Sequence, residues 1–215
     1  MPERFFITGT DTGVGKTIAS ALLCASLDAM YWKPIQTGTV EGTDSDTVKK
    51  ISGIKRERVL PEVYRFAPPV SPHLAARLAG KKIQLAQVRI PEIARRGNLV
   101  VEGAGGVLVP INGTQYMIGL MKHLRLPVLL VARTALGTIN HTLLSLAALR
   151  DARIDVRGVI MSGDQNLENR KAVERYGKVS VVGWIPTLRV LDRKSLLNVF
   201  RKYFDHEAFV RRIPK

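Results

Sequence analysis

The run Gly9–Thr17, with the sequence GTDTGVGKT, has residue types and spacing suited to phosphate chemistry. Its glycines let backbone N–H groups turn toward an anion, and the N-terminus of a following helix adds positive potential. Lys16 would then reach the outer phosphates of a nucleotide, and the Thr17 hydroxyl would take a place on Mg²⁺. The standard pattern has a glycine where Thr10 stands, so this phosphate-binding loop is a variant.

A second candidate is Lys33, which opens the run Lys-Pro-Ile-Gln-Thr-Gly at the end of an expected strand. A lysine beside the phosphates can neutralise charge that develops during phosphoryl transfer, or hold an anionic intermediate. The alternative interpretation is an exposed lysine at the end of a strand.

Two carboxylates complete the set of chemical candidates. Glu102 ends an apolar run, and Asp46 lies in the polar loop after Lys33. Mg²⁺ prefers hard oxygen ligands and keeps waters and phosphate oxygens in its shell. Thr17, Asp46 and Glu102 are therefore the expected metal ligands. Asp46 could instead cap a helix or lie on the surface, and Glu102 could instead orient its loop.

Short apolar runs alternate with helical segments along the chain. Strands are expected near residues 5–7, 30–32, 63–66, 98–102, 127–132, 156–161 and 179–185, and helices near 18–27, 47–51, 74–79, 85–96, 139–150, 167–176 and 195–204. Asp44 or Ser45 is expected to cap the second helix. The glycine-rich run 103–106 is expected to form a sharp turn after the strand that ends at Glu102.

This alternation predicts an α/β fold of the P-loop NTPase type, with a mostly parallel central sheet and helices on both faces. In such sheets, ligands bind at the carboxyl ends of the strands. The loops after Ile7, Trp32 and Val101 should therefore gather on one rim. No linker divides the chain, so residues 1–215 are expected to form one domain.

The composition is strongly basic, with 33 Lys and Arg against 18 Asp and Glu and a net charge of +15. The basic residues form separate doublets without interleaved aromatics, which disfavours a nucleic-acid platform. We expect a solvated basic surface that also attracts anionic substrates, with no nucleic acid or membrane partner. Cys24 is the only cysteine, which excludes an intrachain disulfide. No secretory leader or membrane span is evident, so a cytoplasmic location is expected.

Five motifs in order resemble the dethiobiotin synthetase family. They are the loop Gly9–Thr17, the run 33–38, Ser45-Asp46, the run 101–106 and Gly-Thr-Ile-Asn-His at 137–141. The resemblance implies an ATP-dependent cyclo-ligase of biotin synthesis. It would convert 7,8-diaminopelargonate and CO₂ to a carbamate, phosphorylate the carbamate from ATP, and close the ureido ring, with Mg²⁺ as cofactor.

The resemblance also implies roles for individual residues. Lys33 and Lys16 would be catalytic, and Thr12 and Thr37 would contact the diamine or carbamate. Family members are homodimers, so Thr138 and Asn140 would reach the substrate of the partner subunit. The nucleotide would contact Gly13, Val14, Gly15, Lys16, Thr17, Ile18, Asp46, Glu102, Gly103, Ala104, Gly105, Ser162, Gly163, Ile185, Pro186 and Thr187.

One departure concerns the nucleotide base. Well-known members carry an asparagine for adenine where Ser162 stands here. A hydroxyl can make one hydrogen bond but not the paired recognition of an amide. We therefore expect weak purine selectivity, or recognition by the backbone near Ile185, Pro186 and Thr187.

Two other functions share the phosphate-binding loop. An amidotransferase-coupled synthase, such as the cobyrinic acid diamide type, needs a further domain with a nucleophilic cysteine, and only Cys24 is present. A partition-type ATPase, acting as a nucleotide switch on DNA or membrane, is favoured by the variant loop and the +15 charge. The run that begins at Lys33 favours a substrate-converting enzyme instead.

Overall fold

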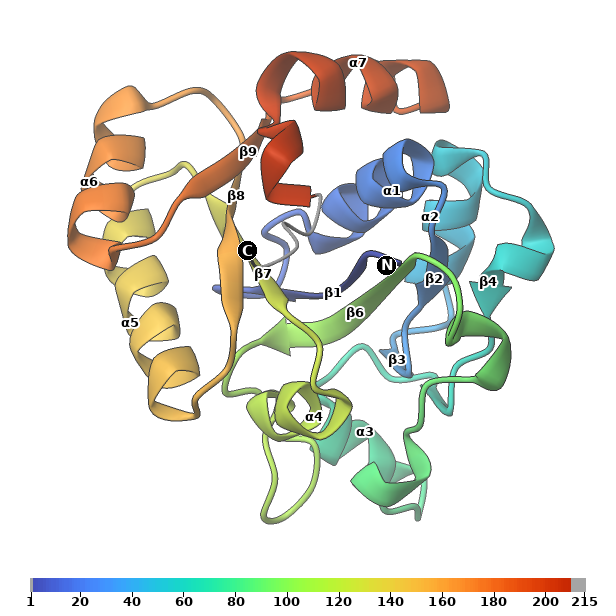
Figure 1. Ribbon diagram of the computed structural model, residues 1–215. Coiled ribbons are helices and arrows are strands. Elements are labelled where there is room, and N and C mark those ends of the chain that lie inside the picture. The colour runs from blue at the N-terminus through green and yellow to red at the C-terminus, as the bar shows by residue number, and fades with distance from the viewer. Residues whose placement is uncertain (1, 210–215) are drawn as a thin grey trace.

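A seven-stranded parallel sheet forms the centre of the computed structural model, which describes residues 2–209 (Figure 1). The strand order is β4-β2-β6-β1-β7-β8-β9. The strands are β1 Arg4–Gly9, β2 Met30–Trp32, β4 Val59–Leu60, β6 Leu99–Gly106, β7 Val128–Arg133, β8 Val156–Ser162 and β9 Val181–Ile185. A second, two-stranded parallel sheet pairs β3 (Ile35–Thr37) with β5 (Tyr64–Phe66).

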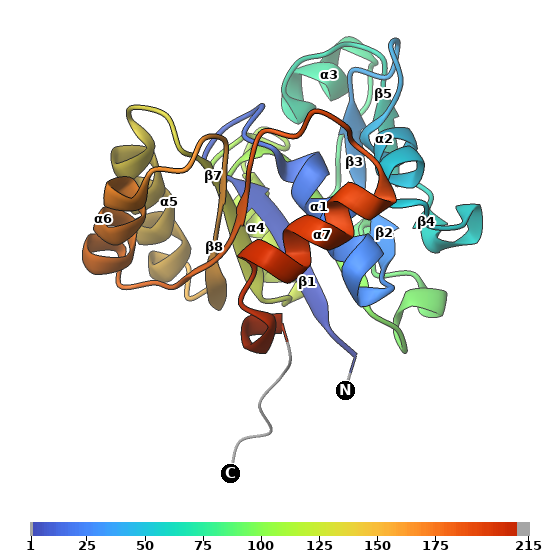
Figure 2. The same cartoon turned by 90° about the horizontal axis from the view of Figure 1, so that it is seen from above.

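Helices cover both faces of the main sheet, as the alternating pattern predicted (Figure 1). Their bounds are α1 Lys16–Leu27, α2 Asp44–Ser52, α3 Pro72–Leu78, α4 Met117–Leu124, α5 Thr138–Asp151, α6 Leu167–Gly177 and α7 Arg193–Tyr203. One buried core lies between the sheet and α1, α2 and α7, and the other lies between the sheet and α3 to α6. Figure 2 shows α7 crossing over α1, which it contacts. The expected α/β fold is confirmed.

The prediction of a helix over residues 85–96 was wrong. The segment contains only two short 3₁₀ turns, Leu85–Gln87 and Glu92–Ala94. Pro91 lies between them, and proline lacks the N–H that a helix needs and disfavours helical geometry at Ile90. The sequence interpretation also missed α4 and the short strands β3 and β4.

The start of α2 and the end of β6, both near the expected site, also differ from the sequence prediction. Thr43 caps α2, and its side chain accepts a hydrogen bond from the Asp46 backbone, so the expected caps Asp44 and Ser45 lie inside the helix. Strand β6 continues to Gly106 rather than turning after Glu102. Gly105 has φ +66°, which glycine adopts without strain, and pairing with β1 keeps the segment extended.

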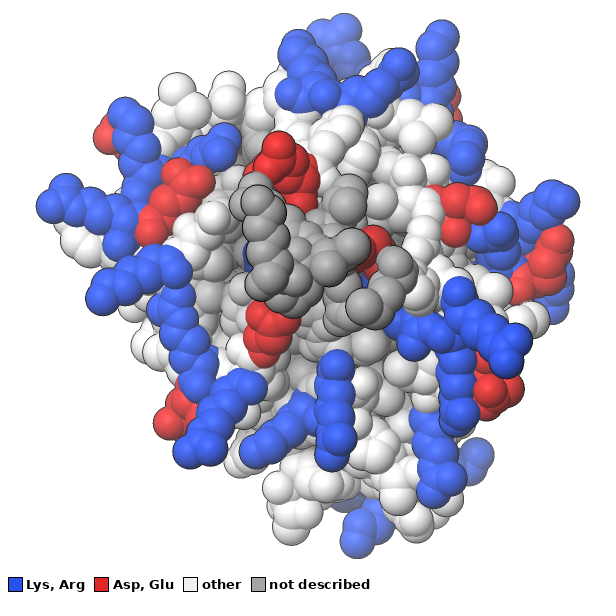
Figure 3. Space-filling model, viewed as in Figure 1, with Lys and Arg blue, Asp and Glu red and all other residues white. Residues whose placement is uncertain are grey.

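Basic side chains are spread over the face shown in Figure 3, with acidic side chains between them. This face carries no continuous basic stripe. Among residues 2–209, no helix is long and apolar enough to span a membrane.

Candidate active site

The phosphate-binding loop joins the end of β1 to the start of α1. Gly13 has φ +70° and Gly15 has φ +97°, and side chains other than glycine rarely tolerate such values. A Cβ at Gly9 would lie 2.7 Å from a methyl of Val14 and 2.8 Å from the carbonyl oxygen of Asp11. This close approach explains why the glycine stands at position 9. Val14 is buried in the core and holds the loop in place.

Lys16 lies at the first position of α1 and folds back over this loop. Its Nζ donates a hydrogen bond to the carbonyl oxygen of Asp11 at 2.9 Å. Burial lowers the pKa of Lys16 to about 8, although the charge of Glu102 acts in the opposite direction. Phosphate groups would raise this pKa again, so the ammonium is suited to binding an anion.

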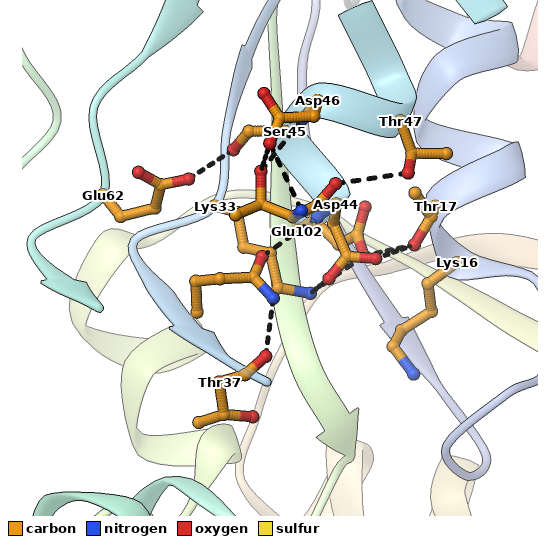
Figure 4. A network of polar contacts seen from close by, with 12 residues as sticks. Lys16, Thr17, Lys33, Thr37, Asp44, Ser45, Asp46, Thr47, Glu62 and Glu102 are labelled. Carbon is orange, nitrogen blue, oxygen red and sulfur yellow. Dashed lines mark hydrogen bonds and ion pairs between the residues drawn. The ribbon is translucent and has the colours of Figure 1, made fainter. Parts of the chain in front are cut away.

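Lys33 follows β2 and is held between two carboxylates (Figure 4). Its Nζ lies 2.8 Å from Oδ2 of Asp44 and 3.1 Å from Oε1 of Glu102. Burial alone would lower the pKa of Lys33, but the charges of Glu102 and Asp44 outweigh it and raise the pKa. The exposed-lysine interpretation is therefore wrong, because Lys33 is only 5% exposed.

Thr17 brings a hydroxyl to the same two carboxylates. Its Oγ1 donates to Oδ1 of Asp44 at 2.6 Å and also lies 3.0 Å from Oε1 of Glu102. Burial is the largest influence and would raise the pKa of Asp44, but the Lys33 charge and the hydrogen bonds from Lys33 and Thr17 together outweigh it and lower the pKa. Three hard oxygens thus converge beside the phosphate-binding loop. They fit part of a Mg²⁺ shell that phosphate and water oxygens would complete.

Asp46 does not belong to this cluster, in contrast to the sequence expectation. Its carboxylate accepts hydrogen bonds from the Thr43 hydroxyl at 2.7 Å and from the Thr43 backbone at 3.3 Å, which forms a capping box. Asp44, two residues earlier, is the carboxylate that meets Thr17 and Lys33. The cap at Thr43 causes this difference, because it turns Asp46 back onto the start of α2.

Two buried side chains that the sequence interpretation missed support the cluster from behind. The Tyr31 hydroxyl donates to Oε2 of Glu102 at 3.0 Å. Burial and the charge of Glu102 raise the pKa of Tyr31 well above its usual value, so the hydroxyl keeps its proton. Oε1 of Gln36 accepts from the backbone N–H of Asp44 at 3.3 Å. The period-two pattern could have indicated Tyr31, because it lies two residues before Lys33 on the same strand face.

A cavity of about 860 Å³ brings the expected phosphate, metal and substrate residues to one rim of the sheet. Of the residues named from sequence, it is lined by Thr12, Gly13, Gly15, Lys16, Thr17, Ile18, Lys33, Thr37, Asp46, Glu102, Ala104 and Gly105. The segments after Ile7, Trp32 and Val101 therefore meet at one rim as expected, although the third is the end of β6 and not a loop.

A smaller cavity of about 180 Å³ gathers the residues expected around the nucleotide base: Ile18, Ser162, Gly163, Ile185, Pro186 and Thr187. Ile18 lines both cavities, so the smaller one lies beside the start of α1. Ser162 contacts the phosphate-binding loop, since its Oγ is 2.7 Å from where a Cβ on Gly15 would stand. The arrangement suits a base at one end and phosphates at the other.

Four expected residues line neither cavity. Val14 packs into the core, and Gly103 lies against the ring of Phe6 and the sulfur of Met117. Thr138 is buried at the start of α5, and its hydroxyl has no hydrogen-bond partner among the described residues. Asn140 is exposed on the same helix.

Comparison with known proteins gives a family model and relatives that cover nearly the whole chain. A family model described as "AAA domain" matches residues 3–195. A protein of Nitrobacter hamburgensis is 47% identical over 98% of this chain and 99% of its own length. One from Agrobacterium fabrum is 45% identical over 98% of both chains. Both carry the name "ATP-dependent dethiobiotin synthetase BioD".

Two solved structures that share this fold are distant from this chain in sequence. A ParA family ATPase from Chlorobium tepidum has a TM-score of 0.58 at 13% identity and covers 94% of this chain and 93% of its own. The MinC:MinD cell division complex of Aquifex aeolicus has a TM-score of 0.55 at 13% identity and covers 99% of this chain and 98% of the matched chain. These similarities establish the fold alone.

Proposed function

The chain belongs to the ATP-dependent dethiobiotin synthetase family, and we propose that its larger cavity closes the ureido ring of dethiobiotin from 7,8-diaminopelargonate, CO₂ and ATP. The observation that carries this assignment is the Lys33 ammonium, buried between Asp44 and Glu102 beside the phosphate-binding loop. A nucleotide switch needs no such buried cation, and the partition-type alternative has no better support.

The reaction divides into three steps. One amine of the substrate adds to CO₂ and loses a proton, which gives a carbamate. A carbamate oxygen attacks the γ-phosphate and ADP leaves, which gives a mixed carbamic–phosphoric anhydride. The second amine then attacks the carbamate carbon and expels phosphate, which closes the ring.

Lys33 supplies positive charge where this chemistry develops negative charge. The two carboxylates use two of its three N–H donors, so a third remains for a carbamate or phosphoryl oxygen, since no further Lys33 contact occurs among the described residues. The carboxylates also hold the ammonium in place before substrate binds, which favours electrostatic stabilisation of the transition state. Thr12 and Thr37 line the same cavity and would orient the diamine.

The nucleotide would lie along the loop between Gly13 and Ile18, with its base in the smaller cavity near Ser162. Lys16 would hold the outer phosphates. Thr17, Asp44 and Glu102 would hold Mg²⁺ through oxygen atoms. Mg²⁺ held there would supply positive charge that neutralises the phosphate groups.

We also propose a homodimer in which Thr138 and Asn140 complete the partner's site. Asn140 is exposed and lies outside the cavity of its own protomer. The same segment exposes Leu136 fully and Leu144 to 62%, which favours coverage by another protein surface. The cytoplasmic location and the single domain over residues 1–215 remain predictions.

A hybrid experiment tests the shared site. Lys33→Gln and Asn140→Ala proteins should each be nearly inactive alone. After subunits are mixed and exchanged, about a quarter of the sites would combine an intact Lys33 with an intact Asn140 from the other subunit, so activity should return. Mixing without recovery, despite measured subunit exchange, would contradict the shared site.

The proposed reaction is tested with the purified protein, diaminopelargonate, bicarbonate, ATP and Mg²⁺. Dethiobiotin should form, and omission of any one component should prevent its formation. ATP hydrolysis without dethiobiotin, in a preparation that binds nucleotide, would contradict the assignment.

A further inference from the structure

Tyr31 lies beneath the larger cavity, and its side chain is fully buried. Strand β2 pairs with β6 in parallel, with Tyr31 beside Val100, and both side chains enter the core under α1. Trp32 and Val101 enter the core on the opposite face. From this register, the ring of Tyr31 reaches along β6 toward its carboxyl end. The strand pairing therefore brings the Tyr31 hydroxyl to Glu102.

The two oxygens of Glu102 have different partners. Oε1 accepts a hydrogen bond from Lys33 at 3.1 Å and lies 3.0 Å from Oγ1 of Thr17, on the side of the cavity. Oε2 accepts from the Tyr31 hydroxyl at 3.0 Å, on the side of the core. Glu102 is only 1% exposed, so loss of this donor would leave Oε2 without contact with bulk water. The carboxylate is thus held from the core by Tyr31 and from the cavity by Lys33.

We propose that Tyr31 is a positioning residue for the metal and phosphate site. Its hydroxyl holds Oε2 of Glu102, so that Oε1 stays turned toward Thr17 and Lys33. Tyr31 is absent from the cavity lining, so its role would be exerted through Glu102 and not by contact with substrate. The inference rests on the proposed function, in which Glu102 binds Mg²⁺. Loss of an outer hydrogen bond to a metal ligand typically weakens metal affinity about 10–100-fold.

The test variant is Tyr31→Phe, which keeps the ring and removes only the hydroxyl. Mn²⁺ serves as the probe, and its binding to the protein–ADP complex is followed by electron paramagnetic resonance. We expect Mn²⁺ affinity to fall about tenfold or more. The Mg²⁺ concentration for half-maximal dethiobiotin synthesis should rise in parallel, while KM for the diamine at saturating Mg²⁺ stays unchanged. Unchanged metal affinity would overturn the proposal.

Trp32→Phe is the matched control. Trp32 is the next residue of the same strand, is equally buried, and donates one hydrogen bond to the carbonyl oxygen of Pro61 at 3.0 Å. Its side chain enters the opposite core, so this variant should lower Tm without changing Mn²⁺ affinity. An equal loss of Mn²⁺ affinity in both variants would show a general loosening of β2 and would overturn the specific role of Tyr31.

Failure of the proposed function can be distinguished from failure of this inference. If Glu102→Gln leaves Mn²⁺ affinity unchanged, Glu102 is not a metal ligand, and the metal site of the proposed function is contradicted. If Glu102→Gln weakens binding and Tyr31→Phe does not, only the role of Tyr31 fails.

If the Tyr31→Phe protein does not fold, a crystal structure of the natural protein with Mg²⁺ and ADP tests the role of Tyr31 instead. A retained bond from Tyr31 to Oε2, with Oε1 facing the metal, supports the proposal. A Tyr31 hydroxyl turned away from Glu102 overturns it.

Discussion

Replacing Lys33 by glutamine removes the cation that lies between Asp44 and Glu102. Two carboxylates then face each other with only hydroxyl and amide donors in contact with them, and the Lys16 ammonium acts on them from a greater distance. Breaking a buried ion pair by removing one partner costs about 3–5 kcal/mol. Because 29% of the Asp44 side chain is exposed, we expect the lower end, about 3 kcal/mol. At about 2–4 °C per kcal/mol for a domain of this size, Tm should fall by roughly 6–12 °C.

The stability loss should depend on pH with a definite sign. Burial would raise the pKa of Asp44, but the Lys33 charge and the hydrogen bonds to Asp44 together outweigh burial, so the pKa is lowered. A carboxyl whose folded-state pKa is depressed stabilises the protein above its unfolded-state pKa, and this contribution is lost as pH falls through the folded-state value. The Tm difference between the natural protein and Lys33→Gln should therefore shrink as the pH is lowered below the ordinary pKa of an aspartate.

Turnover should fall further than stability explains. Removing a preorganised charge that acts in the transition state typically costs about 10²–10³ in kcat. The assay is dethiobiotin formation at a temperature where the variant is fully folded by circular dichroism. Lys50→Gln is the matched control, because Lys50 is an exposed lysine that lines the same cavity. If Lys33→Gln matches Lys50→Gln in Tm and kcat, the reasoning is refuted.

Three further predictions concern the nucleotide and metal. Above the Lys16 pKa of about 8, ADP binding should take up a proton, and ADP affinity should fall by up to about tenfold per pH unit. Calorimetry in two buffers of different ionisation enthalpy measures the proton uptake. Binding without proton uptake would contradict the prediction. Asp44→Asn should raise the half-saturating Mg²⁺ concentration at least about tenfold. Asp46→Asn should leave that concentration unchanged and only weaken the cap of α2, by about 1 kcal/mol. A higher Mg²⁺ requirement in Asp46→Asn alone would restore Asp46 as the metal ligand. Because Ser162 offers one hydroxyl to the base, kcat/KM values for ATP, CTP and GTP should agree within about tenfold, and a strict preference for ATP would contradict this.

Local features of the sequence were sufficient to predict the phosphate-binding loop and the nearby Lys33 and Glu102. Glycines before Lys16 and Thr17 specify a loop conformation and a helix start without reference to the rest of the chain. Buried parallel strands are nearly continuous apolar runs, so the apolar run before Glu102 indicated a strand that carries this carboxylate to the rim, although β6 continues beyond it to Gly106. Strand alternation then placed Lys33 on the same rim.

The choice between Asp44 and Asp46 depended on a finer feature. Both are acidic residues near the start of one helix, and successive helical residues point about 100° apart. The cap is Thr43, so Asp44 is the first helical residue and faces the cavity, while Asp46 folds back onto the cap. Propensity alone does not distinguish adjacent candidate caps, because Thr, Asp and Ser all cap helices well.

Tyr31 and Pro91 illustrate two other limits. The bond from Tyr31 to Glu102 joins residues 71 apart in the chain, and it depends on the register between β2 and β6. The period-two pattern places Tyr31 on the same face as Lys33, but no local pattern specifies the register that brings it to Glu102. Pro91, in contrast, is visible in the sequence, and its effect on the expected helix over residues 85–96 follows from its missing N–H alone. Thr138 and Asn140 depend on a second subunit, which a single chain does not specify.

The central claim is that the site at Lys33 consumes ATP through a carbamate oxygen of the substrate. A single-turnover reaction with CO₂ labelled by heavy oxygen in both positions tests it directly, before the label exchanges with water. One heavy oxygen should appear in the released phosphate, and the other should remain in the ureido carbonyl of dethiobiotin. Dethiobiotin formed together with unlabelled phosphate would contradict the account.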